Sequence, residues 1–205
     1  DFKILGAATT MLKSKKPVIS ICAVRTGSGK SQTTRRIAGI LREAGLKVAA
    51  VRHPMPYGNL EKQRVQRFGS IADLKKHDCT IEEIEEYEPH IVSGTIIYAG
   101  VDYGDILAQA QEEADVVLWD GGNNDTPFYK PDLHIVVADP LRVGNELLYH
   151  PSETNLRLAD VVIINKVDTA DIHATNALRA NIRRVNSRAV IIEAASPITV
   201  TNPEH

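Results

Sequence analysis

The sequence has few cysteines, almost no excess of charge and no long apolar run. Its 205 residues include two cysteines, Cys22 and Cys79, too few and too far apart for a disulfide framework. This cysteine usage fits a reduced, cytoplasmic setting. The net charge of -2 argues against a general basic field for nucleic acid or an anionic membrane, and no apolar stretch has spanning length. We therefore expect neither nucleic acid nor membrane as a partner.

Histidine and cysteine are also too sparse and too irregularly spaced for a zinc site, and no Ser/His/Asp or Cys/His nucleophile arrangement can be placed. What is present is 43% hydrophobic residues, which suits one globular domain with a sizeable core. We expect residues 1–16 to be a lead-in and 17–205 to be the domain. The chain is expected to be a fragment of a longer polypeptide.

Short runs rich in Val and Ile alternate with longer polar segments of helical period. The runs are nearly continuous in apolar character, which is typical of strands covered on both faces. We predict seven strands, at 17–24, 47–52, 94–100, 115–120, 133–139, 160–166 and 189–195. Helices are predicted at 30–45, 61–68, 71–77, 81–87, 102–114, 154–159 and 174–185. This rhythm predicts an α/β fold with three layers and a doubly wound, mostly parallel sheet.

Two predicted helices begin with capping boxes, Ser70 with Asp73 and Thr80 with Glu83, and Gly45 is a natural helix stop. In doubly wound sheets, ligands bind at the carboxyl ends of the strands. The residues that follow each apolar run are therefore the candidates for function.

The first run ends in "RTGSGKS", Arg25 to Ser31. Its glycines allow a tight turn that exposes backbone N–H groups to a phosphate, and Lys30 would reach the β- and γ-phosphates. Ser31 would offer its hydroxyl to Mg²⁺. We expect the nucleotide, ATP or GTP, to contact this loop and the first helical turn: Thr26, Gly27, Ser28, Gly29, Lys30, Ser31 and Gln32.

The glycine that usually opens a P-loop is absent, because Val24 stands there. The loop instead resembles the deviant form K-G-G-x-G-K-[ST], with Arg25 in place of the signature lysine and Thr26 in place of a glycine. That form belongs to a class that includes MinD-type ATPases and metallochaperone GTPases. The resemblance implies a homodimer in which Arg25 reaches the partner's nucleotide. A catalytic or substrate-binding role in its own subunit and a simple surface position stay open.

An aspartate ends the run "DVVLWD", which is the Walker B arrangement. Asp120 would hold the Mg²⁺ shell, so we predict Ser31 and Asp120 as the metal site and Lys30, Asp120 and Arg25 as catalytic residues. The alternative is an aspartate that only caps the strand. Polar side chains at strand ends are the candidates for binding a small phosphorylated or carboxylated acid: Arg52, His53, Asn123, Asn124, Arg142 and His150.

A later strand is followed by "NKVD", residues 165–168. In GTPases, N-K-x-D reads guanine, because the Asp carboxylate accepts from N1–H and the exocyclic amine. Asn165, Lys166 and Asp168 are therefore predicted to bind the base, with Ala195 and Ser196 lying over it. The acidic segment 79–90 is either a solvated helix or a substrate lid to which Glu83, Glu86, Tyr87 and His90 would contribute.

Together, "CAVRTGSGKSQTTRR", "VRHPMPYG", "TIEEIEEYEPH", "LWDGGNND" and "HPSETNLRLADVVIINKVD" resemble the cyclic 2,3-diphosphoglycerate synthetase family. The resemblance runs from about Pro17 to Val200 and implies a P-loop domain of the SIMIBI class. It also implies Mg²⁺-dependent ATP hydrolysis coupled to closing a phosphoanhydride on 2,3-diphosphoglycerate. Two alternatives stay open: a regulatory or chaperone-like GTPase that acts on a protein partner, and a nucleotide-binding module whose catalysis resides elsewhere.

Overall fold

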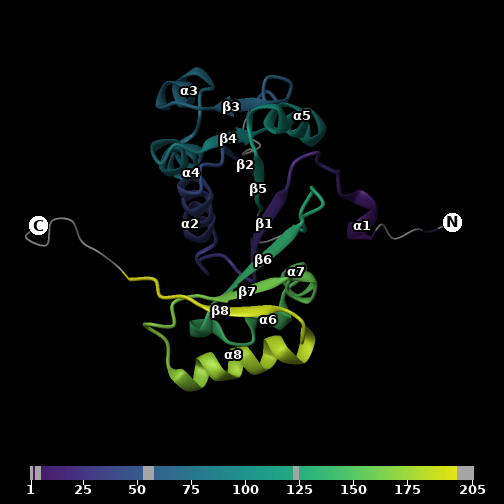
Figure 1. The fold of residues 1–205 in the computed structure, drawn as a ribbon, viewed down its shortest axis with the longest axis vertical. Helices are drawn as coiled ribbons and strands as arrows, with labels where there is room; N and C mark the ends of the chain where they lie inside the picture. The colour runs from purple at the N-terminus through teal and green to yellow at the C-terminus, as the bar shows by residue number, and fades with distance from the viewer. Residues whose placement is uncertain (1, 3–5, 53–57, 122–124, 198–205) are drawn as a thin grey trace, which may run out of the picture.

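The computed structural model describes residue 2 and residues 6–52, 58–121 and 125–197. Within these residues eight strands form a single sheet, in the order β3-β4-β2-β5-β1-β6-β7-β8 (Figure 1). All neighbouring strands are parallel except β3 and β4. The strands are β1 (Val18–Ala23), β2 (Val48–Arg52), β3 (Gln66–Phe68), β4 (Ile96–Ala99), β5 (Val116–Asp120), β6 (Leu133–Ala138), β7 (Val161–Ile164) and β8 (Val190–Glu193).

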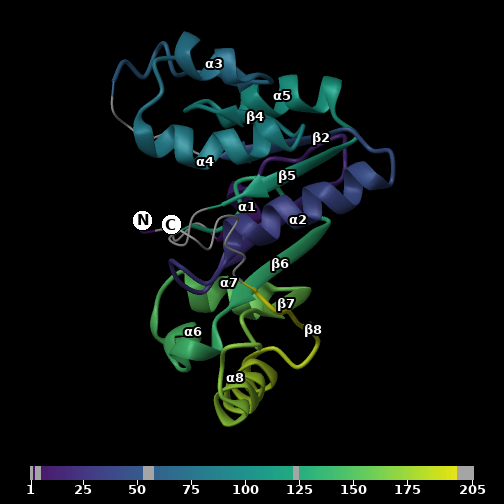
Figure 2. The same ribbon diagram turned by 90° about the vertical axis from the view of Figure 1, so that its left-hand side faces the viewer.

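Helices cover both faces of this sheet, as the prediction of a doubly wound fold requires. Figures 1 and 2 show α2 and α4 on one side of the strands and α5 and α7 on the other. The helices are α1 (Ala7–Thr10), α2 (Lys30–Glu43), α3 (Ile71–Lys76), α4 (Ile81–Val92), α5 (Tyr103–Glu113), α6 (Asn145–Leu148), α7 (Ser152–Leu158) and α8 (Ile172–Val185), with a 3-10 turn η1 (Pro140–Arg142). No described helix is long and apolar enough to cross a membrane.

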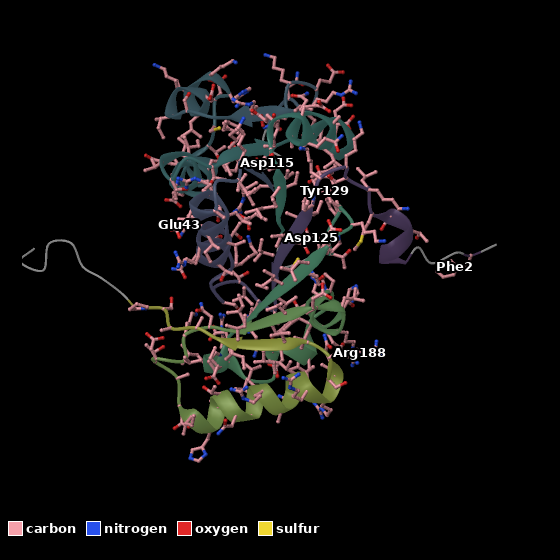
Figure 3. All side chains as sticks on the ribbon, in the orientation of Figure 1. Phe2, Glu43, Asp115, Asp125, Tyr129 and Arg188 are labelled. Carbon is pink, nitrogen blue, oxygen red and sulfur yellow. The ribbon has the colours of Figure 1, made fainter. Side chains whose placement is uncertain are left out.

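The core has two parts because the central strands are apolar on both faces. One part joins strand residues to α2, α3 and α4 through Ala38, Leu74, Tyr87 and Ile91. The other joins them to α5, α7 and α8, and it contains the rings of Tyr103, Trp119, Phe128 and Tyr129, which pack mostly edge to face. Figure 3 shows side chains filling the space between the sheet and the helices, with Tyr129 labelled. This double burial fixes the strand ends that carry the polar residues.

The helix predicted at 61–68 is wrong. Residues 66–68 form β3, the antiparallel edge strand paired with β4. Gln66 and Phe68 are buried while Arg67 between them is exposed, which is the two-residue period of a strand. β3 is an eighth strand that the apolar runs do not reveal, because three residues are too few to make a run.

Other local predictions hold. Both capping boxes are present, at Ser70 and Thr80. Helix α2 ends at Glu43, and Gly45 follows with a φ of 84°. Helix α4 continues past the predicted end at residue 87, through Pro89, as far as Val92. The expected lead-in contains α1, and its Leu12 pairs with Tyr129 in an isolated bridge.

The strand order decides which side chains meet. β1 lies between β5 and β6, with β2 beyond β5 and β7 beyond β6. The loop after β1 is therefore flanked by Asp120 and Arg52 on one side. Asp139 and Asn165, which follow β6 and β7, flank it on the other. All these residues lie at the carboxyl edge of the sheet.

Candidate nucleotide site

The loop between β1 and α2 has a shape that depends on glycine. Gly27 and Gly29 have φ values of 81° and 105°, in the left-handed region that L side chains rarely adopt. A Cβ on Gly29 would also overlap the amide nitrogen of Asn165. Helix α2 starts directly after Gly29 with no side-chain cap, so its first N–H groups and its positive dipole end face the loop. This is the geometry of a phosphate-binding P-loop.

Three consecutive carbonyls of this loop each accept a hydrogen bond from a side chain at a neighbouring strand end. Thr26 O accepts from Arg142 at 2.9 Å, Gly27 O from Lys166 at 2.6 Å, and Ser28 O from Asn165 at 3.0 Å. With its carbonyls turned outward to these donors, the loop leaves its N–H groups for a ligand.

Asp139, which follows β6, organises two of these donors. One of its carboxylate oxygens, Oδ2, accepts from Arg142 Nη2 at 2.8 Å, from Arg142 Nε at 3.1 Å and from Lys166 Nζ at 3.0 Å. Burial by itself would raise the pKa of Asp139, but the hydrogen bonds from Arg142 and Lys166 outweigh it and lower the pKa below its ordinary value. We call Asp139, Arg142 and Lys166 the loop clamp. It holds a cation against each of the carbonyls of Thr26 and Gly27.

Asp120, at the end of β5, is a buried carboxylate that accepts hydrogen bonds from three side chains. It is 1% exposed. Its Oδ1 accepts from Lys30 Nζ at 2.5 Å and from Thr34 Oγ1 at 3.1 Å, and its Oδ2 accepts from Arg52 Nη1 at 2.5 Å. The prediction that Lys30 and Asp120 share one site agrees with this arrangement.

The charge on Asp120 survives burial because of these partners. Burial would raise the pKa of this carboxyl, but Arg52 and Lys30 hold it well below its usual range. The same Nη1 of Arg52 also contacts Glu86 of α4 at 2.7 Å. Asp120 is therefore ionised at neutral pH and stands between a loop lysine and a strand arginine.

The residues predicted for Mg²⁺ fit that ion by their chemistry. Ser31 lies half-buried in the first turn of α2, and Asp120 supplies a carboxylate at the adjacent strand end. Mg²⁺ is usually bound by one or two oxygen side chains together with substrate phosphates and waters. Among the described residues no group of three or more His, Cys, Asp or Glu could hold a metal by itself. A hydroxyl and one carboxylate therefore suit Mg²⁺ only in company with a phosphate.

The residues predicted to bind the base lie together on the β7 side of the loop. Asp168 is exposed, and its Oδ1 accepts from the backbone N–H of Ser196 at 2.9 Å. Ala195 beside it is exposed as well. Asn165 instead lies buried under the P-loop, so its side chain connects the base motif to the phosphate loop. The backbone of Lys166 has a φ of 60°.

The predicted substrate residues do not form one cationic pocket within the described part of the chain. Arg52 and Arg142 are bound to site carboxylates, as described above. His150 lies at the surface, 3.4 Å from Thr154 Oγ1, and Arg25 contacts Asn145 and stacks over the ring of Tyr149 at 5.2 Å. Gln32 is exposed beside the loop. The remaining candidates, His53, Asn123 and Asn124, lie outside the described residues.

Sequence reasoning missed two contributors to this site, Asp139 and Thr34. Asp139 carries the same signal as Asp120, an aspartate after an apolar strand, yet only one of the two was chosen. Thr34 lies one helical turn beyond Lys30, a spacing that places both side chains on one face of α2. Glu86 was named only among the residues of the alternative substrate lid, without the contact to Arg52 that the structure shows.

Comparisons with solved structures show the fold. Hydrogenase maturation factor HypB of Archaeoglobus fulgidus is 21% identical, with 87% of this chain and 80% of that chain covered and a TM-score of 0.56. LpxK of Aquifex aeolicus, solved with ATP, is 14% identical over 96% and 76% of the two chains, with a TM-score of 0.57. FtsY of Thermotoga maritima is 14% identical over 91% and 64%, with a TM-score of 0.56. The chain has the fold of a SIMIBI-class P-loop NTPase.

No family model matches this chain. A curated relative is the arginine synthetase ArcE of Thermococcus kodakarensis, which is 62% identical over 204 residues. The match covers 100% of the chain and 46% of the relative. The chain thus spans less than half the length of that relative.

Proposed function

We propose that this chain is the nucleotide-binding and phosphoryl-transferring part of an ATP-dependent synthetase that acts on a small polar metabolite. The observation that carries the proposal is the pairing of a clamped P-loop with a buried, ionised Asp120 at hydrogen-bond distance from Lys30. The 62% identity to an arginine synthetase over the whole chain supports the synthetase class. P-loop sites catalyse mainly by positioning the phosphates and stabilising their charge.

The residues have separate tasks in this proposal. Loop N–H groups and Lys30 hold the β- and γ-phosphates, while Asp139, Arg142 and Lys166 keep the loop in shape. Ser31 and Asp120 would hold Mg²⁺, which would neutralise charge on the transferring phosphoryl group. Arg52, held 2.5 Å from Asp120, would keep that carboxylate charged and in place.

Phosphorylation of an acceptor oxygen is the step shared by both candidate syntheses. For the cyclic 2,3-diphosphoglycerate family, the acceptor would be a phosphate of 2,3-diphosphoglycerate, and the second phosphate would close the phosphoanhydride. For an arginine-forming synthetase, the carbon that becomes the guanidinium carbon must exchange an oxygen for a nitrogen. A ureido oxygen turned into a phosphate leaving group and displaced by ammonia meets that need. The second acceptor is favoured, because Arg52 and Arg142 are engaged with carboxylates rather than gathered for a polyanion.

The test is release of ADP from Mg·ATP, measured with a ureido amino acid plus ammonium and, separately, with 2,3-diphosphoglycerate. We expect the first pair to stimulate ADP release and the variant Lys30→Ala to abolish it. If only 2,3-diphosphoglycerate stimulates ADP release, the acceptor is a phosphate of that compound and not a ureido oxygen. Absence of stimulation by either would overturn the synthetase proposal.

A second candidate is a GTPase that regulates a protein partner, and one observation favours it. The carboxylate of Asp168 accepts from the backbone N–H of Ser196, so the NKVD motif contacts the segment predicted to lie over the base. Titration with ATPγS and GTPγS in the presence of Mg²⁺ separates the two functions. A clear preference for GTPγS with slow, metabolite-independent turnover would favour the GTPase.

A further inference from the structure

His90 lies deep in the molecule, next to the carboxylate of Asp120. It belongs to α4 and is 0% exposed, and neither ring nitrogen has a partner within the described residues. Buried polar atoms are nearly always paired, so an unpaired imidazole calls for an explanation. Its Nε2 lies 3.6 Å from Asp120 Oδ2, slightly beyond hydrogen-bond distance. The ring is therefore next to the central carboxylate of the site but not bonded to it.

Helix α4 presents two side chains to this carboxylate. Glu86 and His90 are four residues apart and so share one face of the helix. Glu86 contacts the Arg52 nitrogen that also donates to Asp120, and His90 lies beside the same Asp120 oxygen. An element that the motifs of a P-loop NTPase do not include thus reaches the centre of the site.

We propose that His90 is a positioning residue that holds Asp120 in place once nucleotide takes Lys30. This rests on the proposed nucleotide site. A P-loop lysine contacts the β- and γ-phosphates of a bound nucleotide, so binding removes Lys30 from Asp120 Oδ1. The His90 Nε2–H then donates to Oδ2, alongside Arg52. Oδ1 is left available for the Mg²⁺ that Asp120 would hold. No covalent bond is made or broken, and the ring needs to move by less than about 1 Å to reach ordinary N–H···O distance.

The backbone of α4 allows this movement. Pro89 lies inside the helix, directly before His90. Proline has no N–H and so removes one backbone hydrogen bond from the turn that carries the imidazole. That turn therefore resists a small displacement less than a regular helical turn would.

The test uses two amide substitutions whose N–H donors lie at different distances from the backbone. His90→Gln puts its amide nitrogen near the position of Nε2, whereas His90→Asn places it near Nδ1 and too short for Asp120. Affinity for a fluorescent ATP analogue is measured with Mg²⁺ and with EDTA. Mg²⁺ should raise the affinity of His90→Gln by the same factor as that of wild type. In His90→Asn this factor should be about tenfold smaller, which corresponds to the loss of one hydrogen bond to a charged group. Affinity in EDTA should stay unchanged in both.

The matched control is His134 of β6, a second buried histidine, which pairs with Ser20 Oγ at 2.6 Å. His134→Asn should lower the melting temperature and leave the effect of Mg²⁺ as it is. Equal Mg²⁺ dependence in wild type and His90→Asn would overturn the inference while leaving the nucleotide site intact. Equal losses in His90→Asn and His134→Asn would also overturn it. A wild-type protein that binds no nucleotide would instead refute the proposed function.

Discussion

The loop clamp can be tested by removing one charge, in the variant Asp139→Asn. The carboxylate Oδ2 receives three hydrogen bonds from Arg142 and Lys166, and both of these also donate to P-loop carbonyls. An amide is neutral and accepts through one oxygen only, so both cations lose their counter-ion. Each hydrogen bond to a charged group contributes about 1.5–3 kcal/mol. The side chains of Arg142 and Lys166 are 34% and 23% exposed, so the low end applies.

We therefore expect a loss of about 2 kcal/mol in holding the loop, which raises the Kd for nucleotide about 30-fold. The assay is a fluorescence titration with an ATP analogue at neutral pH, with circular dichroism to confirm folding. Asp132→Asn is the matched control, because Asp132 accepts from the backbone N–H of Val18 at 2.8 Å, at the start of β1 rather than at its end. Its Kd should stay within about twofold of wild type. An unchanged Kd for Asp139→Asn, or equal losses in both variants, would refute the clamp.

The same clamp predicts a pH dependence. The pKa of Asp139 is lowered in the folded protein, so the unfolded chain binds its proton first as pH falls. Its contribution to stability is therefore complete above the unfolded pKa, about 4, and is lost as pH falls through the folded value. The difference in unfolding free energy between wild type and Asp139→Asn should be constant from pH 6 to 8 and shrink below about pH 4. Urea denaturation at several pH values measures it.

Three further outcomes follow from the site and its surroundings. Gly29→Ala should abolish nucleotide binding, because its φ of 105° is strained for alanine and its Cβ would overlap Asn165; Gly39→Ala, inside α2 with nothing within 4 Å, should keep binding and raise unfolding free energy by about 0.5–1 kcal/mol. Asp168→Asn should weaken GTPγS and spare ATPγS if the carboxylate reads guanine, and equal effects on both would exclude that role. Burial raises the pKa of Cys22 to about 12, so iodoacetamide at pH 8 should label this thiol only after unfolding, as peptide mass spectrometry would show.

The sequence predicted the sheet and the phosphate loop well because each leaves a local signal. Apolar runs mark strands that are covered on both faces, and the glycines before Lys30 mark a turn that other residues cannot make. Asp120 was found because it directly follows such a run. Each of these features depends on residues that are adjacent in the sequence, so one sequence is enough to predict them.

Pairing between distant side chains was the part that sequence could not supply. Arg52 and Arg142 were identified as free cations for a polyanion, yet both are held by carboxylates. Arg52 is held by Asp120 from another strand end, and Arg142 by Asp139, three residues before it in the chain. Asp139 resembles Asp120 in sequence. Only the order of β5, β1 and β6 shows that Asp120 faces Lys30, whereas Asp139 lies on the other side of β1 and holds the side chains that bind the loop carbonyls. β3 was missed because its order comes from pairing with β4 rather than from its own pattern.

The bonds from Asn165 and Lys166 to the P-loop also have a consequence for how the protein is made. They join positions 137 and 139 residues apart in the chain. During synthesis, the entire glycine-rich motif leaves the ribosome long before its outward carbonyls find their partners. A nascent chain that ends before β7 contains the P-loop sequence but lacks Asn165 and Lys166, which hold the loop in its folded conformation. At the proposed site, nucleotide binding would therefore require that the two halves of the sheet have assembled, and the nucleotide would stabilise only molecules that have reached this stage.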